Sequence, residues 1–317
     1  MKVLITDKMA NEAIQLLKDA GHDITIDEMD GETLLKNIAN YDALMIRGRT
    51  KAIEDIVKTG AKGKLKVIGR AGIGVDNVDL KTAAKEGIKV VNAPTGATAS
   101  VAELTIAHML SLSRHLTKAD STMKNGEWAK KQLKGNELYG KTLGLIGCGN
   151  IGKLTAKYAQ AFNMLIIGYD PFISKEDMQK DGIKKLEELG DLMKTADFIS
   201  LHLPHISATH HIVNKEMISK MKPSAYLINC ARGGTVDEKA LYDTLKNGKI
   251  AGAGIDVFEN EPPKDSPLLE LENVVLTPHI GANTKEGQIR AGTVCAQQII
   301  KVLNEETPEF WINKDLM

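Results

Sequence analysis

A histidine and two glutamates in the last fifth of the sequence have the residue types of a proton-transfer site. His279 lies in "LTPHIGA", and Glu259 and Glu261 lie in "GIDVFENEPP"; each segment begins with a short apolar run of the kind that forms a buried strand. A neutral imidazole can take a proton from a hydroxyl group near physiological pH, and a neighbouring carboxylate orients the ring. A lone histidine of this kind can also be purely structural, so the rest of the sequence must decide.

An arginine in "INCARGGTVDE" has the chemistry to hold an organic acid. Arg232 follows a strand-like run and precedes two glycines, which places it at the carboxyl edge of a strand, where open α/β sheets bind ligands. A guanidinium binds a carboxylate through two parallel hydrogen bonds. The alternative is a surface arginine in a loop. Its position, with Glu261 and His279, after a dinucleotide-binding motif favours the catalytic interpretation of all three.

That motif is the glycine turn in "LGLIGCGNIGK". Gly147 permits a tight turn, Gly149 lets the backbone approach a pyrophosphate, and Gly152 lets the following helix pack close to its strand. The phosphates would then lie on the amides of Asn150 and Ile151, at a helix N-terminus whose dipole favours an anion. A glycine-rich chain can match this pattern by chance, but here a strand-like run precedes it and a helical pattern over residues 150–162 follows.

An acidic residue after the next strand-like run strengthens the assignment. Asp170, in "GYDPF", comes 18 residues after Gly152, close to the position expected for the acid that binds the adenosine ribose. A carboxylate there accepts hydrogen bonds from the ribose hydroxyls and repels a 2′-phosphate, and no arginine follows it. The alternative is an ordinary turn aspartate before Pro171. The sequence therefore predicts an NAD site in preference to an NADP site.

The elements that must position these residues alternate between strand and helix. Such alternation predicts parallel sheets with helices on both faces. One long helical stretch over residues 98–128 interrupts it, and a last helix over residues 285–304 is expected to pack back on the first unit. The fold class is therefore α/β, with two doubly wound parallel-sheet domains. The strand candidates are residues 2–6, 42–48, 65–71, 89–93, 141–147, 164–170, 197–204, 225–231, 252–258 and 274–280.

Length and composition limit the classes of protein that are possible. A chain of 317 residues suits two domains, and 41 Lys+Arg against 41 Asp+Glu gives no electrostatic reason to expect nucleic acid or an anionic membrane as a partner. Three unevenly spaced cysteines read as reduced thiols, and neither a signal peptide nor a membrane-spanning run is apparent. We expect a cytoplasmic protein without a metal site.

The motifs together resemble one enzyme family over almost the whole chain. The sequence is similar to the D-isomer-specific 2-hydroxyacid dehydrogenases, and most similar to those members that act on D-3-phosphoglycerate. Several long segments in the family order are far more specific than any one motif. The resemblance rests on "GRAGIGVDNVD" (69–79), "SVAELTIAHML" (100–110), "GLIGCGNIGK" (144–153), "NCARGGTVDE" (229–238), "GAGIDVFENEPP" (252–263) and "LTPHIGANT" (276–284).

The resemblance implies a role for each site residue. Arg232 corresponds to the family's carboxylate-binding arginine, His279 to its catalytic histidine, and Glu261 to the glutamate that pairs with that histidine. Asp256 corresponds to the residue that accepts a hydrogen bond from the nicotinamide amide. The implied cofactor contacts are Gly147, Gly149, Asn150, Ile151, Gly152, Asp170, Leu203, Thr209, Cys230, Asp256, His279 and Gly281.

The resemblance also implies an architecture. Residues 1–98 and 287–317 would form a flavodoxin-like substrate-binding domain, and residues 99–286 a Rossmann NAD-binding domain inserted into it. The substrate would lie in a cleft that excludes water on closing, and the long middle helix would form a homodimer contact. Many relatives continue into a regulatory domain that binds serine, and because this sequence ends at Met317 we expect none here.

The implied reaction is NAD-dependent oxidation of D-3-phosphoglycerate to 3-phosphohydroxypyruvate. Arg47 and Arg49, in "IRGRT", would bind the phosphate, and backbone amides around Ala71 and Gly72 would help Arg232 to hold the carboxylate. A glyoxylate or hydroxypyruvate reductase remains an alternative, because it would share the three catalytic groups; a non-enzymatic NAD-binding scaffold is a more remote one. Lys130 and Lys131 are either further phosphate ligands or simply a solvated face.

Overall fold

The chain folds into two units, each built on its own parallel sheet. The computed structural model describes residues 1–317. One unit comprises Met1–Thr98 and Ala282–Met317, and the other comprises Ala99–Gly281. The sequence places the second boundary at residue 286, whereas in the structure the return to the first unit comes slightly earlier, just before the last helix.

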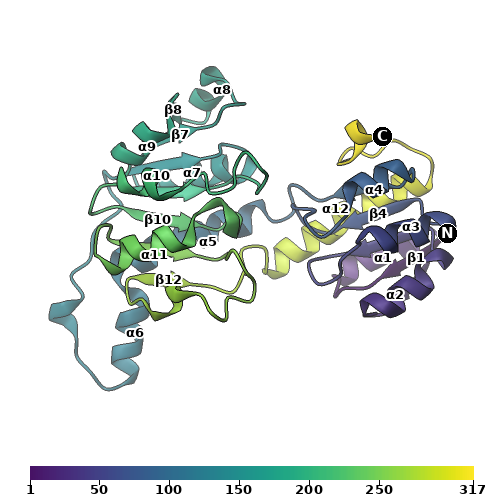
Figure 1. Cartoon of the computed structure of the whole chain (residues 1–317), viewed down its shortest axis with the longest axis horizontal. Helices are drawn as coiled ribbons and strands as arrows, with labels where there is room; N and C mark the ends of the chain where they lie inside the picture. The colour runs from purple at the N-terminus through teal and green to yellow at the C-terminus, as the bar shows by residue number, and fades with distance from the viewer. The chain divides into compact units, whose positions relative to one another are not determined.

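The first unit is built on a five-stranded, all-parallel sheet in the order β2-β1-β3-β4-β5. This is the flavodoxin-like order. Helices flank the sheet on both faces, as Figure 1 shows. The strands are β1 (Lys2–Ile5), β2 (Asp23–Ile26), β3 (Ala43–Ile46), β4 (Val67–Arg70) and β5 (Lys89–Asn92); the helices are α1 (Asn11–Asp19), α2 (Gly31–Asn37), α3 (Glu54–Lys62), α4 (Leu80–Lys85) and α12 (Lys285–Leu303), with 3-10 turns η1 (Ile38–Asn40) and η5 (Lys314–Leu316).

Alternate residues of these strands enter two separate cores. Val3, Ile5 and Met45 pack with α1 and α12, whereas Leu4 and Leu44 pack with α2 and α3 on the opposite face. Because both faces are covered, the strands read as continuous apolar runs, which is typical of parallel sheets. The last helix of the chain is therefore part of the first unit, as the sequence predicts.

The second unit is built on a seven-stranded, all-parallel sheet in the order β12-β11-β10-β9-β6-β7-β8. The strand order reverses at β6, and doubly wound sheets bind ligands at the carboxyl ends of strands at such a switch point. The strands are β6 (Thr142–Ile146), β7 (Leu165–Tyr169), β8 (Lys184–Lys185), β9 (Phe198–Leu201), β10 (Tyr226–Asn229), β11 (Gly252–Ile255) and β12 (Val274–Leu276).

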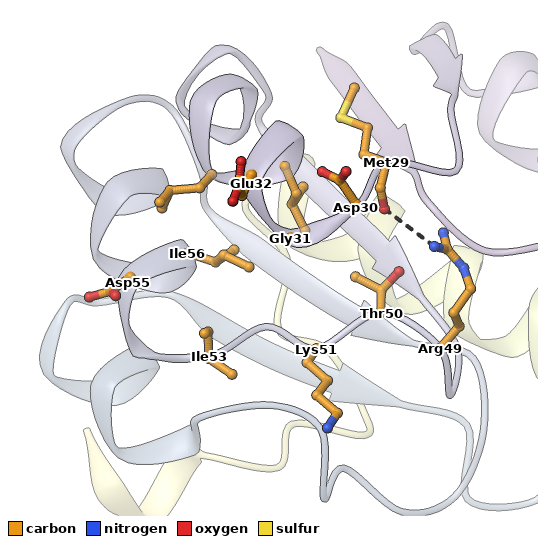
Figure 2. A pocket seen from close by; sticks show the side chains of 12 residues that line it. Met29, Asp30, Gly31, Glu32, Arg49, Thr50, Lys51, Ile53, Asp55 and Ile56 are labelled. Atoms are coloured by element: carbon orange, nitrogen blue, oxygen red, sulfur yellow. Dashed lines mark hydrogen bonds between the residues drawn. The ribbon is translucent and has the colours of Figure 1, made fainter.

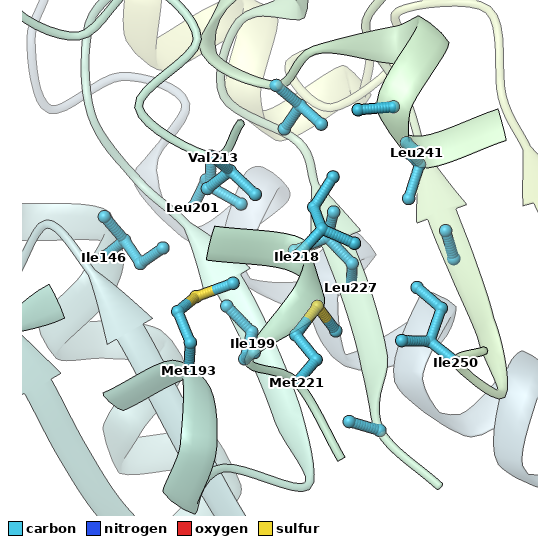
Figure 3. Packing of buried hydrophobic residues seen from close by; sticks show 14 of the residues in the cluster. Ile146, Met193, Ile199, Leu201, Val213, Ile218, Met221, Leu227, Leu241 and Ile250 are labelled. Carbon is cyan, nitrogen blue, oxygen red and sulfur yellow. The ribbon is translucent and has the colours of Figure 1, made fainter. Parts of the chain in front are cut away.

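Helices cover this sheet as well. One core lies under α9, α10 and α11; Figure 3 shows Ile199, Leu201 and Leu227 of the strands meeting Met193, Ile218 and Leu241 of these helices. The predicted fold class, two doubly wound parallel-sheet units, is confirmed. The helices are α5 (Thr98–Arg114), α6 (Leu116–Lys124), α7 (Asn150–Ala161), α8 (Lys175–Lys180), α9 (Leu189–Thr195), α10 (Lys215–Ser219) and α11 (Glu238–Lys246), with 3-10 turns η2 (Lys130–Gln132), η3 (Gly233–Thr235) and η4 (Pro267–Glu270).

The long middle helix expected from the sequence is two helices. His115, between α5 and α6, has φ 52°, a left-handed conformation that ends the first helix. Its ring nitrogen Nε2 lies 3.3 Å from the carbonyl oxygen of Lys134, so the break is tied to the segment that follows. None of the helices in the structure combines the length and the apolar character needed to cross a bilayer.

Candidate active site

The three glycines of the turn after β6 differ in their surroundings. Gly149 has open space beside it, whereas Gly147 and Gly152 lie against backbone atoms of the protein. A methyl group on Gly147, which has φ 90°, would lie 2.6 Å from the carbonyl oxygen of His202, and one on Gly152 would overlap the carbonyl of Gly147. A methyl group on Gly149 would meet no atom within 4 Å. Gly149 immediately precedes α7, whose first amides, on Asn150 and Ile151, have no acceptor within the helix. The turn therefore presents amides to open space, as a pyrophosphate requires.

Asp170 follows β7 and is attached to the glycine turn. Its Oδ2 accepts a 2.9 Å hydrogen bond from the amide of Cys148, and its Oδ1 accepts from the amides of Phe172 at 2.9 Å and Ile173 at 3.3 Å. The carboxylate is thus held beside the turn with its remaining lone pairs available to a ribose. Burial, helped by the Asp170 charge, raises the pKa of the Cys148 thiol to about 12, so this cysteine packs as an inert side chain.

The other cofactor candidates line the same edge of the sheet. Leu203 lies against the turn, because its Cβ would be 3.3 Å from a methyl group on Gly147. The hydroxyl of Thr209 lies 2.6 Å from the carbonyl oxygen of Pro204 and accepts a 2.8 Å hydrogen bond from the amide of Ile206, so it closes its own loop. The Cys230 side chain is buried, and this burial raises the pKa of its thiol.

Asp256 organises the loop that carries the histidine. It follows β11, is almost fully buried, and accepts hydrogen bonds from the hydroxyl of Thr277 at 2.6 Å and from the amides of Ile280 at 2.8 Å and Gly281 at 2.9 Å. Its own carbonyl accepts a 2.8 Å bond from the amide of His279. One aspartate therefore fixes residues 277–281 around the histidine and keeps Gly281 beside its own carboxylate.

His279 has a left-handed backbone and a defined partner. Its φ is 52°, a conformation that costs a non-glycine residue free energy and that occurs often at functional sites. Its Nδ1 lies 2.7 Å from Oε2 of Glu261, and the two side chains are 48% and 38% exposed. An ionised carboxylate only accepts, so Nδ1 carries the proton and Nε2 keeps the lone pair. Nε2 is consequently the basic atom of the ring.

Arg232 is the third member of the group. A methyl group on Gly233 would overlap the carbonyl of Phe258, so this glycine allows the arginine loop to approach the backbone that leads to Glu261. Burial opposes ionisation of Glu261, but the His279 hydrogen bond and charge, the Phe258 amide and the Arg232 charge together hold its pKa below the ordinary value. The charges of Arg232 and His279 thus both act on Glu261, so the three side chains lie near one another in the second unit.

In the first unit, the two amides expected to contact the substrate carboxylate have partners within the protein. The amide of Ala71 donates to the carbonyl of Ile46 at 2.8 Å, and the amide of Gly72 donates to the carbonyl of Arg70 at 2.8 Å. Both amides therefore already have a backbone acceptor inside the unit. No backbone carbonyl accepts from the next two amides, on Ile73 and Gly74, which makes them further candidates in the same loop.

The two arginines after β3 differ in how many hydrogen bonds their guanidinium groups donate to the protein. Arg49 donates from Nε to Oδ1 of Asp7 at 3.1 Å, from Nη1 to the carbonyl of Met29 at 3.3 Å, and from Nη2 to the carbonyl of Thr6. Arg47 makes one long contact, 3.4 Å from Nη1 to the carbonyl of Lys8. Arg47 therefore keeps more of its donors for an anion than Arg49 does.

Arg49 also borders a pocket of about 470 Å³ in the first unit. Figure 2 shows its guanidinium bonded to the Met29 carbonyl at one side of this pocket, whose other walls come from α2 and α3. None of the three catalytic candidates lines it. The residues that line the pocket all belong to the first unit.

Arg70 is a cationic residue that the sequence analysis did not select. It ends β4 and is level with Ile46 of β3, so it lies at the same sheet edge as Arg47. Its guanidinium packs over Gly72, where a methyl group would overlap it. The available signal was its position as the last residue of the apolar run "KVIGR", one strand over from Arg47.

Comparison with known proteins places this geometry in context. A family described as "D-isomer specific 2-hydroxyacid dehydrogenase, NAD binding domain" matches residues 106–281, more than half of the chain. That span contains the glycine turn, Asp170, Asp256 and His279. NAD is the cofactor of this domain, and the open face of Gly149 with the carboxylate of Asp170 fits it.

Individual relatives extend the match over the whole chain. The chain is 50% identical over 313 residues to a D-3-phosphoglycerate dehydrogenase from Methanocaldococcus jannaschii, covering 99% of this chain and 59% of that protein. It is 47% identical to a hydroxypyruvate reductase from Thermotoga maritima, covering 95% of this chain and 98% of that protein. A crystal structure of D-lactate dehydrogenase from Aquifex aeolicus with NAD and lactic acid superposes with TM-score 0.84 at 30% identity, covering 96% of each chain.

Proposed function

This chain belongs to the D-isomer-specific 2-hydroxyacid dehydrogenase family, and on that premise we propose that it oxidises D-3-phosphoglycerate at C2 with NAD as hydride acceptor. The product would be 3-phosphohydroxypyruvate, which would place the chain at the first step of serine biosynthesis. The observation that carries the proposal is the bond between His279 and Glu261 beside the charge of Arg232. The substrate assignment is supported by the Methanocaldococcus relative, although the chain spans only about three-fifths of its length.

Each of the three groups has one task. Arg232 binds the C1 carboxylate and so fixes C2 and its hydroxyl. Nε2 of His279 takes the hydroxyl proton, and Glu261 stabilises the imidazolium that results. When bound, NAD supplies the ring carbon that accepts the hydride. Asp256 keeps the histidine loop in place and has a lone pair on Oδ2 for an amide ligand.

Residues of the first unit would bind the remaining groups of the substrate. We assign the phosphate to Arg47, with Arg70 at the same sheet edge as a second cation. Arg49 adds positive charge near this edge, but its guanidinium already bonds to Asp7 and to the Met29 carbonyl within the first unit. The carboxylate would accept from the amides of Ile73 and Gly74.

A hydroxypyruvate reductase is the second candidate. It is favoured by the Thermotoga relative, which this chain matches over 98% of that protein's length. Both reactions use the same three catalytic groups and differ in the need for a phosphate site. Retention of all three groups argues against a scaffold that only binds NAD.

The deciding experiment is kcat/KM on D-3-phosphoglycerate, hydroxypyruvate, glyoxylate and D-lactate, each in its feasible direction with NAD or NADH. The proposal predicts the highest value for the phosphorylated substrate. A higher value for hydroxypyruvate or glyoxylate would transfer the assignment to the reductase. No turnover of any 2-hydroxy or 2-oxo acid would refute the enzymatic assignment.

A homodimer in the cytoplasm is the remaining part of the proposal. The homodimer is supported by large apolar side chains that are exposed on and after α6, including Met123 at 56% and Trp128 at 79%. The cytoplasmic location is supported by three cysteines that are free and buried. Figure 1 shows α6 and the following segment extending away from the sheet of the second unit. Sedimentation of the wild type and of Trp128→Glu would test it: a wild-type monomer would contradict the dimer.

A further inference from the structure

A buried histidine in α5 stands behind the loop that carries His279. His108 is 2% exposed and its Nε2 lies 3.1 Å from Oγ1 of Thr277. The same Oγ1 lies 2.6 Å from Oδ1 of Asp256. The three side chains form a line that starts in a helix and ends on the aspartate that holds the amides of Ile280 and Gly281.

The direction of the hydrogen bonds follows from the partners. An ionised Asp256 can only accept, so the single hydroxyl proton of Thr277 points to Oδ1. The Thr277 oxygen must then accept from His108, which puts the ring proton on Nε2. Nδ1 of His108 has no hydrogen-bond partner in the structure, and in this tautomer it carries no proton that would need an acceptor. Burial, opposed by the charge of Asp256, lowers the pKa of His108, so the ring is a neutral donor.

The surrounding backbone is shaped to accept this ring. A methyl group on Gly254, in β11, would lie 2.9 Å from both Cβ and Nδ1 of His108. Glycine at this position therefore admits the imidazole between α5 and the sheet, two residues before Asp256. An aliphatic side chain could fill the same space but could not donate to Thr277.

We propose that His108 is a positioning residue of the active site, which fixes the Thr277 hydroxyl on Asp256 and thereby the left-handed backbone of His279. This inference rests on the proposed function, because the loop it positions carries the proposed base. His108 is buried behind Thr277, so it would act through that residue and not by touching a ligand. Its effect therefore appears in turnover and in NAD affinity, and not in the ability of the chain to fold.

The experiment compares His108→Leu, which removes the donor, with His108→Gln, whose amide can replace it. Steady-state kinetics with the best substrate of the panel, NAD affinity by calorimetry and thermal unfolding are measured on each. We expect His108→Leu to lower kcat roughly 10- to 100-fold, since a small misplacement of a reacting group costs that much. We expect His108→Gln to stay within about threefold of the wild type.

A double-mutant cycle separates positioning from simple packing. Because His108 acts through the Thr277 hydroxyl, His108→Leu should cost little further activity in a Thr277→Val background. Equal and additive losses in both backgrounds, or a lower unfolding temperature with unchanged kcat, would overturn the inference. A wild-type chain without dehydrogenase activity would instead refute the proposed function, while the calorimetric NAD affinities would still test His108.

Discussion

Nδ1 of His279 lies 2.7 Å from Oε2 of Glu261, although the two residues reach each other from loops after different strands. The contact assigns the proton to Nδ1 and leaves Nε2 as a base. Glu261 is in turn held by the amide of Phe258, 3.2 Å from its other oxygen. The carboxylate is thus fixed before any ligand arrives.

Glu261→Gln should lower kcat roughly 100-fold with little change in KM, because the amide can hold the ring but cannot stabilise an imidazolium. Steady-state rates at saturating NAD check it. A variant with wild-type kcat would show that Glu261 has no role in proton transfer.

The same residue should affect the pH dependence of stability. The pKa of Glu261 is held below its ordinary value of 4.5 in the folded chain. The stabilisation is therefore fully present above pH 4.5 and is lost as the pH falls through the lowered folded pKa. Thermal unfolding of wild type and Glu261→Gln across this range should show the difference between them shrinking toward acid. A difference that does not depend on pH would contradict the assignment.

The glycine turn offers a matched pair of substitutions. Gly149→Ala should leave the free energy of unfolding within about 1 kcal/mol of the wild type and weaken NAD roughly tenfold or more, because its methyl group enters the space meant for the ligand. Gly147→Ala should instead cost about 2 kcal/mol or more of stability, because φ is 90° and the His202 carbonyl is in the way. Calorimetry and denaturant unfolding distinguish the two effects. Equal NAD affinity for Gly149→Ala and wild type would place the cofactor elsewhere.

Replacing Arg47 and Arg49 singly should affect two different properties, substrate kinetics for Arg47 and stability for Arg49. Arg47→Ala should lower kcat/KM for D-3-phosphoglycerate roughly 10- to 100-fold and leave hydroxypyruvate within about threefold, since only the former carries a phosphate. Arg49→Ala should mainly lower stability, by about 1 kcal/mol or more, because the buried Asp7 loses a partner. An equal loss on both substrates for Arg47→Ala would refute the phosphate assignment.

Much of this architecture could be predicted from the sequence because both sheets are buried on two faces. Continuous apolar runs then identify the central strands, such as β3 and β10, within a residue or two of their ends. The short edge strands β2 and β8 were not predicted. β2 is only partly buried and β8 consists of two lysines, so neither has an apolar run.

The positions of Arg232 and His279 just after strand ends could be predicted, because apolar runs mark those strands. The site was not predictable where backbone geometry decides. The break at His115 depends on a left-handed residue that no glycine marks. The use of the Ala71 and Gly72 amides inside the first unit, and the burial of His108 behind Thr277, likewise become visible only from the folded backbone.

The most direct test of the central claim is the rate of NADH formation from D-3-phosphoglycerate by wild type and His279→Gln, with NAD affinity measured on the same samples. The account predicts turnover by the wild type and a loss of roughly 10²- to 10⁴-fold in the variant, with a much smaller change in NAD affinity. Equal rates for the two proteins would contradict it, since proton transfer would then not depend on this imidazole.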